Sequence, residues 1–231
     1  MRVLQAFAAA VAVLVFAQAA KAEDAATITL GVVPSVPAAA TYLAVEKGYF
    51  KEAGITVDLQ NIESSATAMA LLASNRMQVV EGGVASNYWN ALASGLPVIL
   101  ALERASSPLY HDVLIRKELV GQIKTPADLK GRPIAEVAPG SSAIYEVGQV
   151  LEAGGLSLKD VDIKYIPFPQ MGIALANGAV DAAFEVPPFG AVVAANGQAV
   201  KWIDPEQYVK VLPSSFVGYF ANTDALKANA L

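Results

Sequence analysis

Apolar and polar positions follow two different periods along this chain. The stretches 26–33 and 55–59 are rich in β-branched residues and alternate in the way that half-buried strands do. The stretches 38–47 and 64–75 instead repeat apolar positions every three or four residues, which predicts helices. Ser64, at the start of the second of these, has a side-chain oxygen that can satisfy a free N–H group of the first helical turn.

The same alternation continues along the chain. Further strands are predicted over 77–83, 96–102, 111–117, 132–138, 161–167, 179–186, 199–203 and 214–220. Further helices or helical turns are predicted over 86–95, 125–131, 141–153, 170–178 and 188–197. Strands that alternate with helices of about ten residues indicate βαβ units, so the fold class is α/β with mainly parallel sheets.

The first 22 residues have the pattern of a secretory signal peptide. Arg2 precedes an apolar run from Val3 to Ala19, and Ala20-Lys21-Ala22 supplies the small residues of a cleavage site. The alternative, a membrane anchor, is disfavoured because the run is short and rich in alanine. We therefore expect residues 1–22 to be removed on export.

Charge and cysteine content narrow the function classes. Removing residues 1–22 takes away two of the 16 basic residues and none of the 21 acidic ones, so the formal charge falls from −5 to −7. This balance argues against nucleic-acid binding, which needs a basic face. The chain has no cysteine, hence no disulfide, no thiol nucleophile and no attachment point for a lipid. We expect a soluble, non-lipidated protein in the periplasm.

Several enzyme classes lack their motifs. Gly140-Ser141 belongs to no P-loop because the lysine is missing, and no G-x-G-x-x-G follows the strand at 26–33. A single histidine, His111, cannot form a multi-histidine metal site, and we expect no metal and no cofactor. His111 could serve a serine nucleophile at Ser141 or Ser142, but the G-x-S-x-G elbow is absent. We expect His111 to lie at the surface or at a hinge, beside solvent or a carboxylate.

The turn at 138–142, Ala-Pro-Gly-Ser-Ser, is the strongest candidate for chemistry. Glycine permits close approach of the backbone, and the first N–H groups of the following helix have no partners within it. Together with two hydroxyls they form a cup of donors suited to an anionic or carbonyl oxygen. The alternative is that Ser141 only caps its own helix. Similar turns precede the helices at 64–75 and 86–95, which favours a ligand site at the ends of the strands.

The stretch 30–59 resembles the opening of the extracytoplasmic solute-binding proteins of ABC importers, in the nitrate, sulfonate, taurine and thiamine-precursor group (SsuA/THI5-like, NMT1). The stretches 90–98, 125–135 and 177–189 match later landmarks of that family in order. The resemblance covers residues 27 to about 225. It implies a two-lobed, periplasmic-binding-protein-like (type II) fold, and it is specific to the family but not to a substrate.

The resemblance also implies how the chain is organised. Lobe 1 would hold residues 27–114 and 205–231, and lobe 2 would hold 115–204. Relatives continue with further helices on lobe 1, and the uncapped helical pattern at 221–231 fits a C-terminally truncated chain or a frayed terminal helix. The expected protein is a monomer, not an enzyme, that captures a small-molecule solute and delivers it to ABC permease and ATPase subunits. An enzyme on the same fold, acting on a pyrimidine or small ester, is the alternative.

Carried over position by position, the resemblance gives a set of expected ligand-binding residues. They are Ser35, Val36, Thr41, Tyr42, Ser65, Ser86, Asn87, Gly140, Ser141, Ser142, Glu185 and Val186. Val186 stands where many relatives carry tryptophan, which would reshape the pocket. A carboxylate at Glu185, if it faces the cleft, would repel a sulfonate or nitrate and favour an organic, nitrogen-containing solute. The alternative is that Glu185 points to solvent. Tyr42, Tyr88 and Trp89 are candidates for stacking on a ring, or for core packing.

Overall fold

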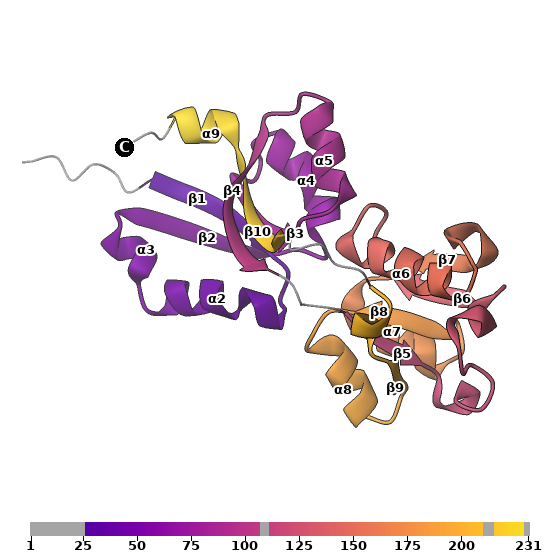
Figure 1. Ribbon diagram of the computed structural model, residues 1–231. Helices are drawn as coiled ribbons and strands as arrows, with labels where there is room; N and C mark the ends of the chain where they lie inside the picture. Colours follow the sequence, from indigo (N-terminus) through magenta and orange to yellow (C-terminus); the bar gives the residue numbers. More distant parts are fainter. Residues whose placement is uncertain (1–25, 107–110, 210–214, 229–231) are drawn as a thin grey trace, which may run out of the picture.

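The structure, a computed structural model, describes residues 26–106, 111–209 and 215–228, which form two α/β lobes (Figure 1). The expected signal peptide at 1–22 lies outside these residues. No helix in the described ranges has the length and apolar character needed to cross a membrane. The expected strands and helices are present, with ends that shift by a few residues from the sequence pattern.

The first lobe is built on a five-stranded sheet with the strand order β2-β1-β3-β10-β4. Its strands are β1 (Ala26–Val32), β2 (Ile55–Asn61), β3 (Val79–Gly83), β4 (Val98–Ser106) and β10 (Ser215–Asn222). β1 pairs in parallel with both β2 and β3, whereas β10 is antiparallel to β3 and β4. Only β10 therefore runs against the other four strands.

The second lobe is built on a sheet with the order β7-β6-β8-β5-β9. Its strands are β5 (Asp112–Ile115), β6 (Pro133–Glu136), β7 (Asp162–Tyr165), β8 (Ala182–Glu185) and β9 (Val200–Ile203). β6 is parallel to β7 and β8, and β5 is antiparallel to β8 and β9. The lobe boundary placed at 114/115 from the sequence falls inside β5, whose four residues all pair within this sheet.

The two sheets have equivalent strand orders, and each contains one reversed strand. In each case the reversed strand is the first that the chain enters after it passes from the other sheet. Both sheets are thus mixed, with four of the five strands of each running in one direction, as mainly parallel sheets require. The single reversed strand in each was not predicted. Alternation of strands and helices predicts parallel neighbours only for strands joined by a crossover. It carries no signal for a strand inserted from a distant part of the chain.

Helices cover both sheets (Figure 1). Those of the first lobe are α2 (Ala39–Glu46), α3 (Tyr49–Glu52), α4 (Ser65–Ala73), α5 (Ser86–Ala93) and α9 (Thr223–Ala228). Those of the second lobe are α6 (Ser142–Ala153), α7 (Phe168–Ala176) and α8 (Phe189–Ala195). Short 3₁₀ turns lie at Val36–Ala38, Lys117–Leu119, Pro126–Leu129, Leu158–Asp160 and Pro205–Gln207.

The sheet of the second lobe is buried on both faces. Val113 and Phe184 pack in one apolar cluster, with α6, whereas Leu114 and Ala183 pack in a second cluster, with α7. Successive residues of a strand point to opposite faces, so two clusters on one strand require a layer on each side. These layers leave only the edges and ends of the strands accessible for a site.

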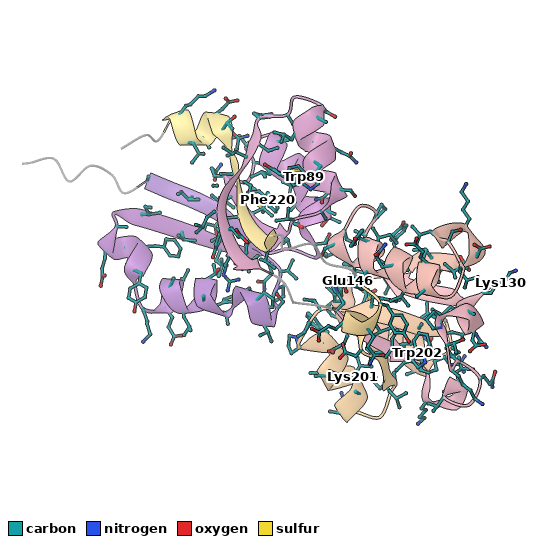
Figure 2. The ribbon with its side chains drawn as sticks, viewed as in Figure 1. Trp89, Lys130, Glu146, Lys201, Trp202 and Phe220 are labelled. Atoms are coloured by element: carbon teal, nitrogen blue, oxygen red, sulfur yellow. The ribbon has the colours of Figure 1, made fainter. Side chains whose placement is uncertain are left out.

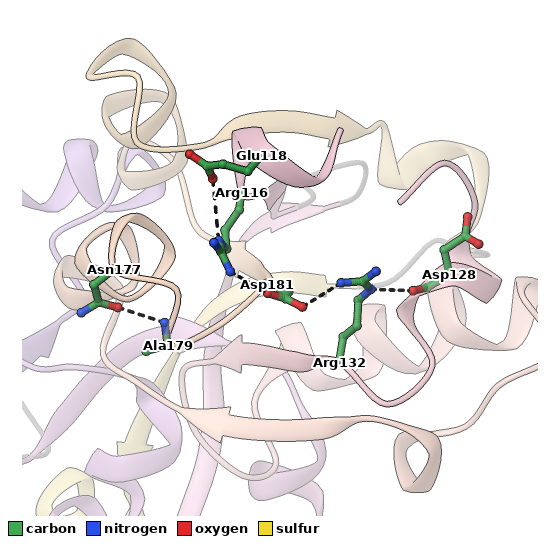
Figure 3. A network of polar contacts seen from close by, with 7 residues as sticks. All are labelled: Arg116, Glu118, Asp128, Arg132, Asn177, Ala179 and Asp181. Atoms are coloured by element: carbon green, nitrogen blue, oxygen red, sulfur yellow. Dashed lines mark hydrogen bonds and ion pairs between the residues drawn. The ribbon is translucent and has the colours of Figure 1, made fainter. Parts of the chain in front are cut away.

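In the second lobe, a network of charged side chains links β5, β6 and β8 at the ends that lie away from the first lobe. Asp181, just before β8, accepts from Arg116 at 3.2 Å and from Arg132 at 2.9 Å, so one carboxylate joins the end of β5 to the start of β6 (Figure 3). The Arg132 Nε also donates to the Asp128 carbonyl at 2.8 Å. The network fixes the register of these strands at one end while their other ends carry the site.

We expect Asp181→Ala to lower the free energy of unfolding by about 1–2 kcal/mol, because two charged donors lose their acceptor but stay partly solvated. Asp162→Ala removes the partner of Lys164 from a well-exposed pair and is the matched control, with an expected loss below about 1 kcal/mol. Urea titration measures both. Equal losses in the two variants would show that the Asp181 network adds nothing beyond a surface ion pair.

Candidate functional site

A cavity of about 60 Å³ lies between the lobes. The first lobe lines it with Val33, Ser35, Pro37, Ser64, Ser65, Glu81, Gly82, Gly83 and Val217. The second lobe lines it with His111, Val137, Ser141, Ser142, Phe168 and Val186. Most of these residues end or follow the parallel strands β1, β2, β3, β6, β7 and β8, which is where open α/β sheets bind ligands. Val217 instead lies in β10, and His111 precedes β5. α4 and α6 begin at the cavity from the two lobes.

The start of α4 forms the wall on the first lobe. The Ser64 hydroxyl accepts from the Thr67 N–H at 3.2 Å and caps the helix, as predicted. The Ser65 hydroxyl donates to the Gly83 carbonyl at 3.3 Å. A side chain at Gly82 would place its Cβ 2.4 Å from the Ser65 Cβ, so glycine is needed there for α4 to lie against β3. The Ser64 hydroxyl also donates to Thr67 Oγ1 at 3.3 Å, so both serine hydroxyls donate to acceptors within the protein.

The Pro-Gly-Ser-Ser turn forms the opposite wall. The Ser141 hydroxyl accepts from the Ile144 N–H at 3.2 Å, which caps α6, and donates to the fully buried Glu136. The Glu136 carboxylate also accepts from the Ala138 N–H at 2.8 Å. Burial raises the pKa of Glu136, and the hydrogen bonds that it accepts offset this only in part. Ser141 both caps its helix and lines the cavity, whereas the Ser142 hydroxyl makes no hydrogen bond within the described residues.

Glu81, at the end of β3, brings a carboxylate to the cavity. It is 2% exposed and accepts from the Thr41 hydroxyl and from Arg104. Thr41 also shares a hydrogen bond of 2.6 Å with the Tyr219 hydroxyl. Burial raises the pKa of the Glu81 carboxyl, and the contacts from Thr41 and Arg104 oppose the rise without cancelling it. The wall of the first lobe therefore carries a buried acceptor of hydrogen bonds.

His111 brings an imidazole to the cavity. It is 5% exposed, its Nδ1 lies 2.9 Å from Glu146 Oε1, and its backbone N–H donates to the other carboxylate oxygen at 3.0 Å. Glu146 projects from α6, on the side of the second lobe that faces the first (Figure 2). The ring stacks on Phe168, with centroids 6.0 Å apart. Burial disfavours the charged imidazole, but Glu146, aided by Glu136 and Asp112, outweighs it and raises the pKa of His111.

The structure brings together some of the residues expected to bind a ligand and not others. Those that line the cavity are Ser35, Ser65, Ser141, Ser142 and Val186. Those that do not line it are Val36, Thr41, Tyr42, Ser86, Asn87, Gly140 and Glu185.

The residues outside the lining have other partners. Thr41 supports Glu81, and the Tyr42 hydroxyl donates to Asn61 at 2.9 Å. Tyr88 is buried in the core of the first lobe, where its hydroxyl accepts from the Leu100 N–H, and Trp89 is 55% exposed on its outer side. None of the three aromatic residues proposed for stacking lines the cavity.

Glu185 neither faces the cleft nor points to solvent. It is fully buried in the second lobe, and neither of its carboxyl oxygens has a hydrogen-bond partner among the described residues. Burial and the nearby charge of Asp112 raise the pKa of Glu185 to about 8. The sequence allowed Glu185 to face either the cleft or solvent. Because both faces of β8 are covered by apolar clusters, the side chain is instead buried inside the second lobe.

The lining residues that the expected set omits include Glu81, Phe168 and His111. Glu81 interrupts an apolar strand just before two glycines, and this was a usable signal for a functional carboxylate. The position of Phe168, between two prolines after a strand, was a weaker signal for a residue at the site. His111 was expected at the surface or a hinge; it does have a carboxylate partner, but it is buried at the cavity because Glu146 holds it there.

The residues present offer little to a metal ion. No group of three or more His, Asp or Glu side chains in the described ranges is placed to hold one. The polar groups at the cavity are instead hydroxyls, one imidazole, one carboxylate and the first N–H groups of α4 and α6. Such a set can both donate and accept hydrogen bonds.

The two-lobed structure is similar to solved structures of periplasmic binding proteins. The alkanesulfonate-binding protein SsuA of Xanthomonas axonopodis, bound to MOPS, superimposes with a TM-score of 0.74 at 20% identity over 88% of this chain and 68% of that chain. The periplasmic nitrate-binding protein NrtA of Synechocystis gives 0.74 at 17% identity, over 89% and 57%. The fold is therefore the two-lobed fold of periplasmic binding proteins.

Sequence comparison gives the family. A Haemophilus influenzae protein assigned to thiamine biosynthesis is 28% identical over 147 residues, which are 62% of this chain and 44% of that protein. The chain thus spans less than half of the length of this relative. The sequence model of the NMT1/THI5-like family matches residues 37–230. Because that match extends over most of the sequence, the chain belongs to the NMT1/THI5-like family.

Proposed function

We propose that this chain is the soluble substrate-binding component of an ABC importer and captures a small organic solute between its two lobes. The observation that carries the proposal is the cavity, whose walls come from both lobes and at which α4 and α6 both begin. A site split between two bodies suits capture by closure. The fold shared with proteins named for binding alkanesulfonates and nitrate supports the same function.

Closure follows from the division of the site. A solute that contacts both walls binds the closed arrangement better than the open one, so it shifts the equilibrium towards closed. A shift from 1:99 to 99:1 requires about 5 kcal/mol of differential binding. Several hydrogen bonds at about 1 kcal/mol each, together with contacts to Phe168 and the lining valines, are of that order.

The proton positions in the cavity favour one class of solute. The hydroxyl protons of Ser65 and Ser141 are directed to protein acceptors, so the donor cup expected from the sequence is reduced to backbone N–H groups and to Ser35 and Ser142. Glu81 adds a buried acceptor on the wall of the first lobe. A solute with N–H donors as well as an acceptor group, such as an aminopyrimidine or taurine, fits better than a bare oxyanion.

The same contacts argue against hydrolysis. The Ser141 hydroxyl donates to Glu136 and caps α6, so it is not directed to the imidazole at the cavity, His111. A serine nucleophile of the Ser-His-acid type passes its hydroxyl proton to the imidazole. We therefore propose capture without turnover, in the periplasm after removal of residues 1–22, followed by delivery by a monomer to a permease and its ATPase.

We expect 4-aminopyrimidine or taurine to raise the melting temperature of the protein more than nitrate or methanesulfonate does, and to be recovered unchanged by mass spectrometry. A probe at 100 times its Kd adds about 2.7 kcal/mol to the free energy of unfolding. Ser142→Ala should weaken binding of the active probe about two- to tenfold by calorimetry, through loss of one hydrogen bond.

Ser74→Ala is the matched control, since Ser74 is an exposed serine that donates only to the Leu71 carbonyl. It should bind the active probe as the original protein does. Stabilisation by none of the four probes, or conversion of one of them, would contradict the proposed function. Equal affinities of Ser142→Ala and Ser74→Ala would remove Ser142 from the site.

A further inference from the structure

The turn at 138–142, which lines the cavity, also contacts the first lobe directly. Ser141 and Ser142 face the cavity, whereas the carbonyl of the preceding Gly140 points to the first lobe. It accepts from the Asn87 N–H at 3.2 Å and from the Ser86 hydroxyl at 3.3 Å. One turn of the second lobe thus contacts both the cavity and the start of α5.

α5 depends on this contact for its cap. Its N-cap residue is Ala85, which has no side chain to accept a hydrogen bond, although the first N–H groups of a helix need acceptors. The Gly140 carbonyl meets part of that need from the other lobe. Gly140 has φ +75°, a left-handed conformation that favours glycine, so the backbone itself directs this carbonyl to α5.

A second bond joins the lobes beside other lining residues. The Val36 N–H donates to the Pro187 carbonyl at 2.9 Å. Val36 follows Ser35 and Pro187 follows Val186, and both of these neighbours line the cavity. The lobes are therefore hydrogen-bonded to each other at two places, each one residue away from the cavity wall, and both contacts run directly from protein to protein.

We propose that the Gly140 carbonyl and the first turn of α5 form a latch that holds the lobes closed independently of solute. The latch gives a role to Ser86, Asn87 and Gly140, which lie next to the cavity lining without belonging to it: they join the two lobes. Its value for solute capture rests on the function proposed above: a latch lowers the differential binding that a solute must supply. The latch itself is tested without any solute.

Cross-linking tests the closed contact directly, because the chain has no cysteine of its own. A Cβ at Gly140 would lie 3.5 Å from the Asn87 Cβ, within the range of a disulfide. We expect the Asn87→Cys, Gly140→Cys double variant of the full chain to form a disulfide in solute-free oxidising buffer. The Ser94→Cys, Gly140→Cys variant, with one cysteine at the other end of α5, is the control and should stay reduced.

Removal of one donor tests the latch without a new residue at Gly140. Ser86→Ala should lower the closed-to-open ratio of the solute-free protein about two- to tenfold, measured by distance between spin labels on the two lobes. Ser94→Ala is matched to it, since that hydroxyl donates to Asn90 within the same helix. Equal distance distributions in these two variants, or cross-linking no faster than in the control pair, would overturn the latch while leaving solute binding untouched.

Discussion

Glu185→Gln should make the protein more stable than the original at pH 8, by a margin that grows steadily from pH 5. The carboxyl is fully buried without a partner, and burial together with Asp112 raises its pKa from 4.5 to about 8. Between these values the unfolded chain releases the proton and the folded chain keeps it. The stability that this group contributes is therefore complete below pH 4.5 and is lost as the pH rises towards 8.

The size of the effect follows from the same two values. Each pH unit in the window costs the original protein about 1.4 kcal/mol relative to a variant that does not ionise, so the difference approaches 4 kcal/mol at pH 8. Urea titrations of both proteins at pH 5, 6.5 and 8 measure it. Glu63→Gln, at an exposed glutamate, controls for loss of one negative charge. A difference that stays flat with pH would mean that Glu185 is ionised in the fold and has a partner.

Glu81→Ala should lower the free energy of unfolding by about 3–5 kcal/mol. The change leaves Arg104, which is 16% exposed, without its carboxylate and removes an acceptor from the buried Thr41 hydroxyl. Breaking one side of a buried pair costs more than the pair itself contributes, because the remaining charge is left unpaired in a poorly solvated place.

A double-mutant cycle separates these contributions. Arg104→Met alone leaves a buried carboxylate, whereas the double variant Glu81→Gln, Arg104→Met leaves no unpaired charge and should be more stable than Arg104→Met. Glu81→Gln alone keeps the shape of the side chain and should lose less than Glu81→Ala. Additive losses across the cycle would show that Glu81 and Arg104 are not coupled.

Local signals in the sequence predicted the elements well. The caps at Ser64 and Ser141 and the strand alternation depend on residues a few positions apart, and the structure confirms them. The insertion of β10 between β3 and β4 depends on pairing across more than 100 residues of sequence, for which a single sequence carries no signal. The order of the strands in each sheet could therefore not be predicted from the sequence, whereas the α/β fold class could.

The candidate site divides in the same way. Ser65, Ser141 and Ser142 could be placed at the cavity because helix starts after strands are visible in the sequence. The roles of Glu81 and His111 depend on partners 23 and 35 positions away, Arg104 and Glu146, and these pairs form only after the lobes fold. Gly140 was assigned to the ligand, but its carbonyl is used by α5.

The reversed strands impose an order on assembly. The second sheet draws all of its strands from one continuous stretch, 112–203, and can be completed as soon as that stretch is available. The first sheet lacks its inner strand until residues 215–222 have been synthesised, because β10 separates β3 from β4. During synthesis from the N-terminus, the sheet of the first lobe therefore stays incomplete between β3 and β4 until the whole second lobe has been made.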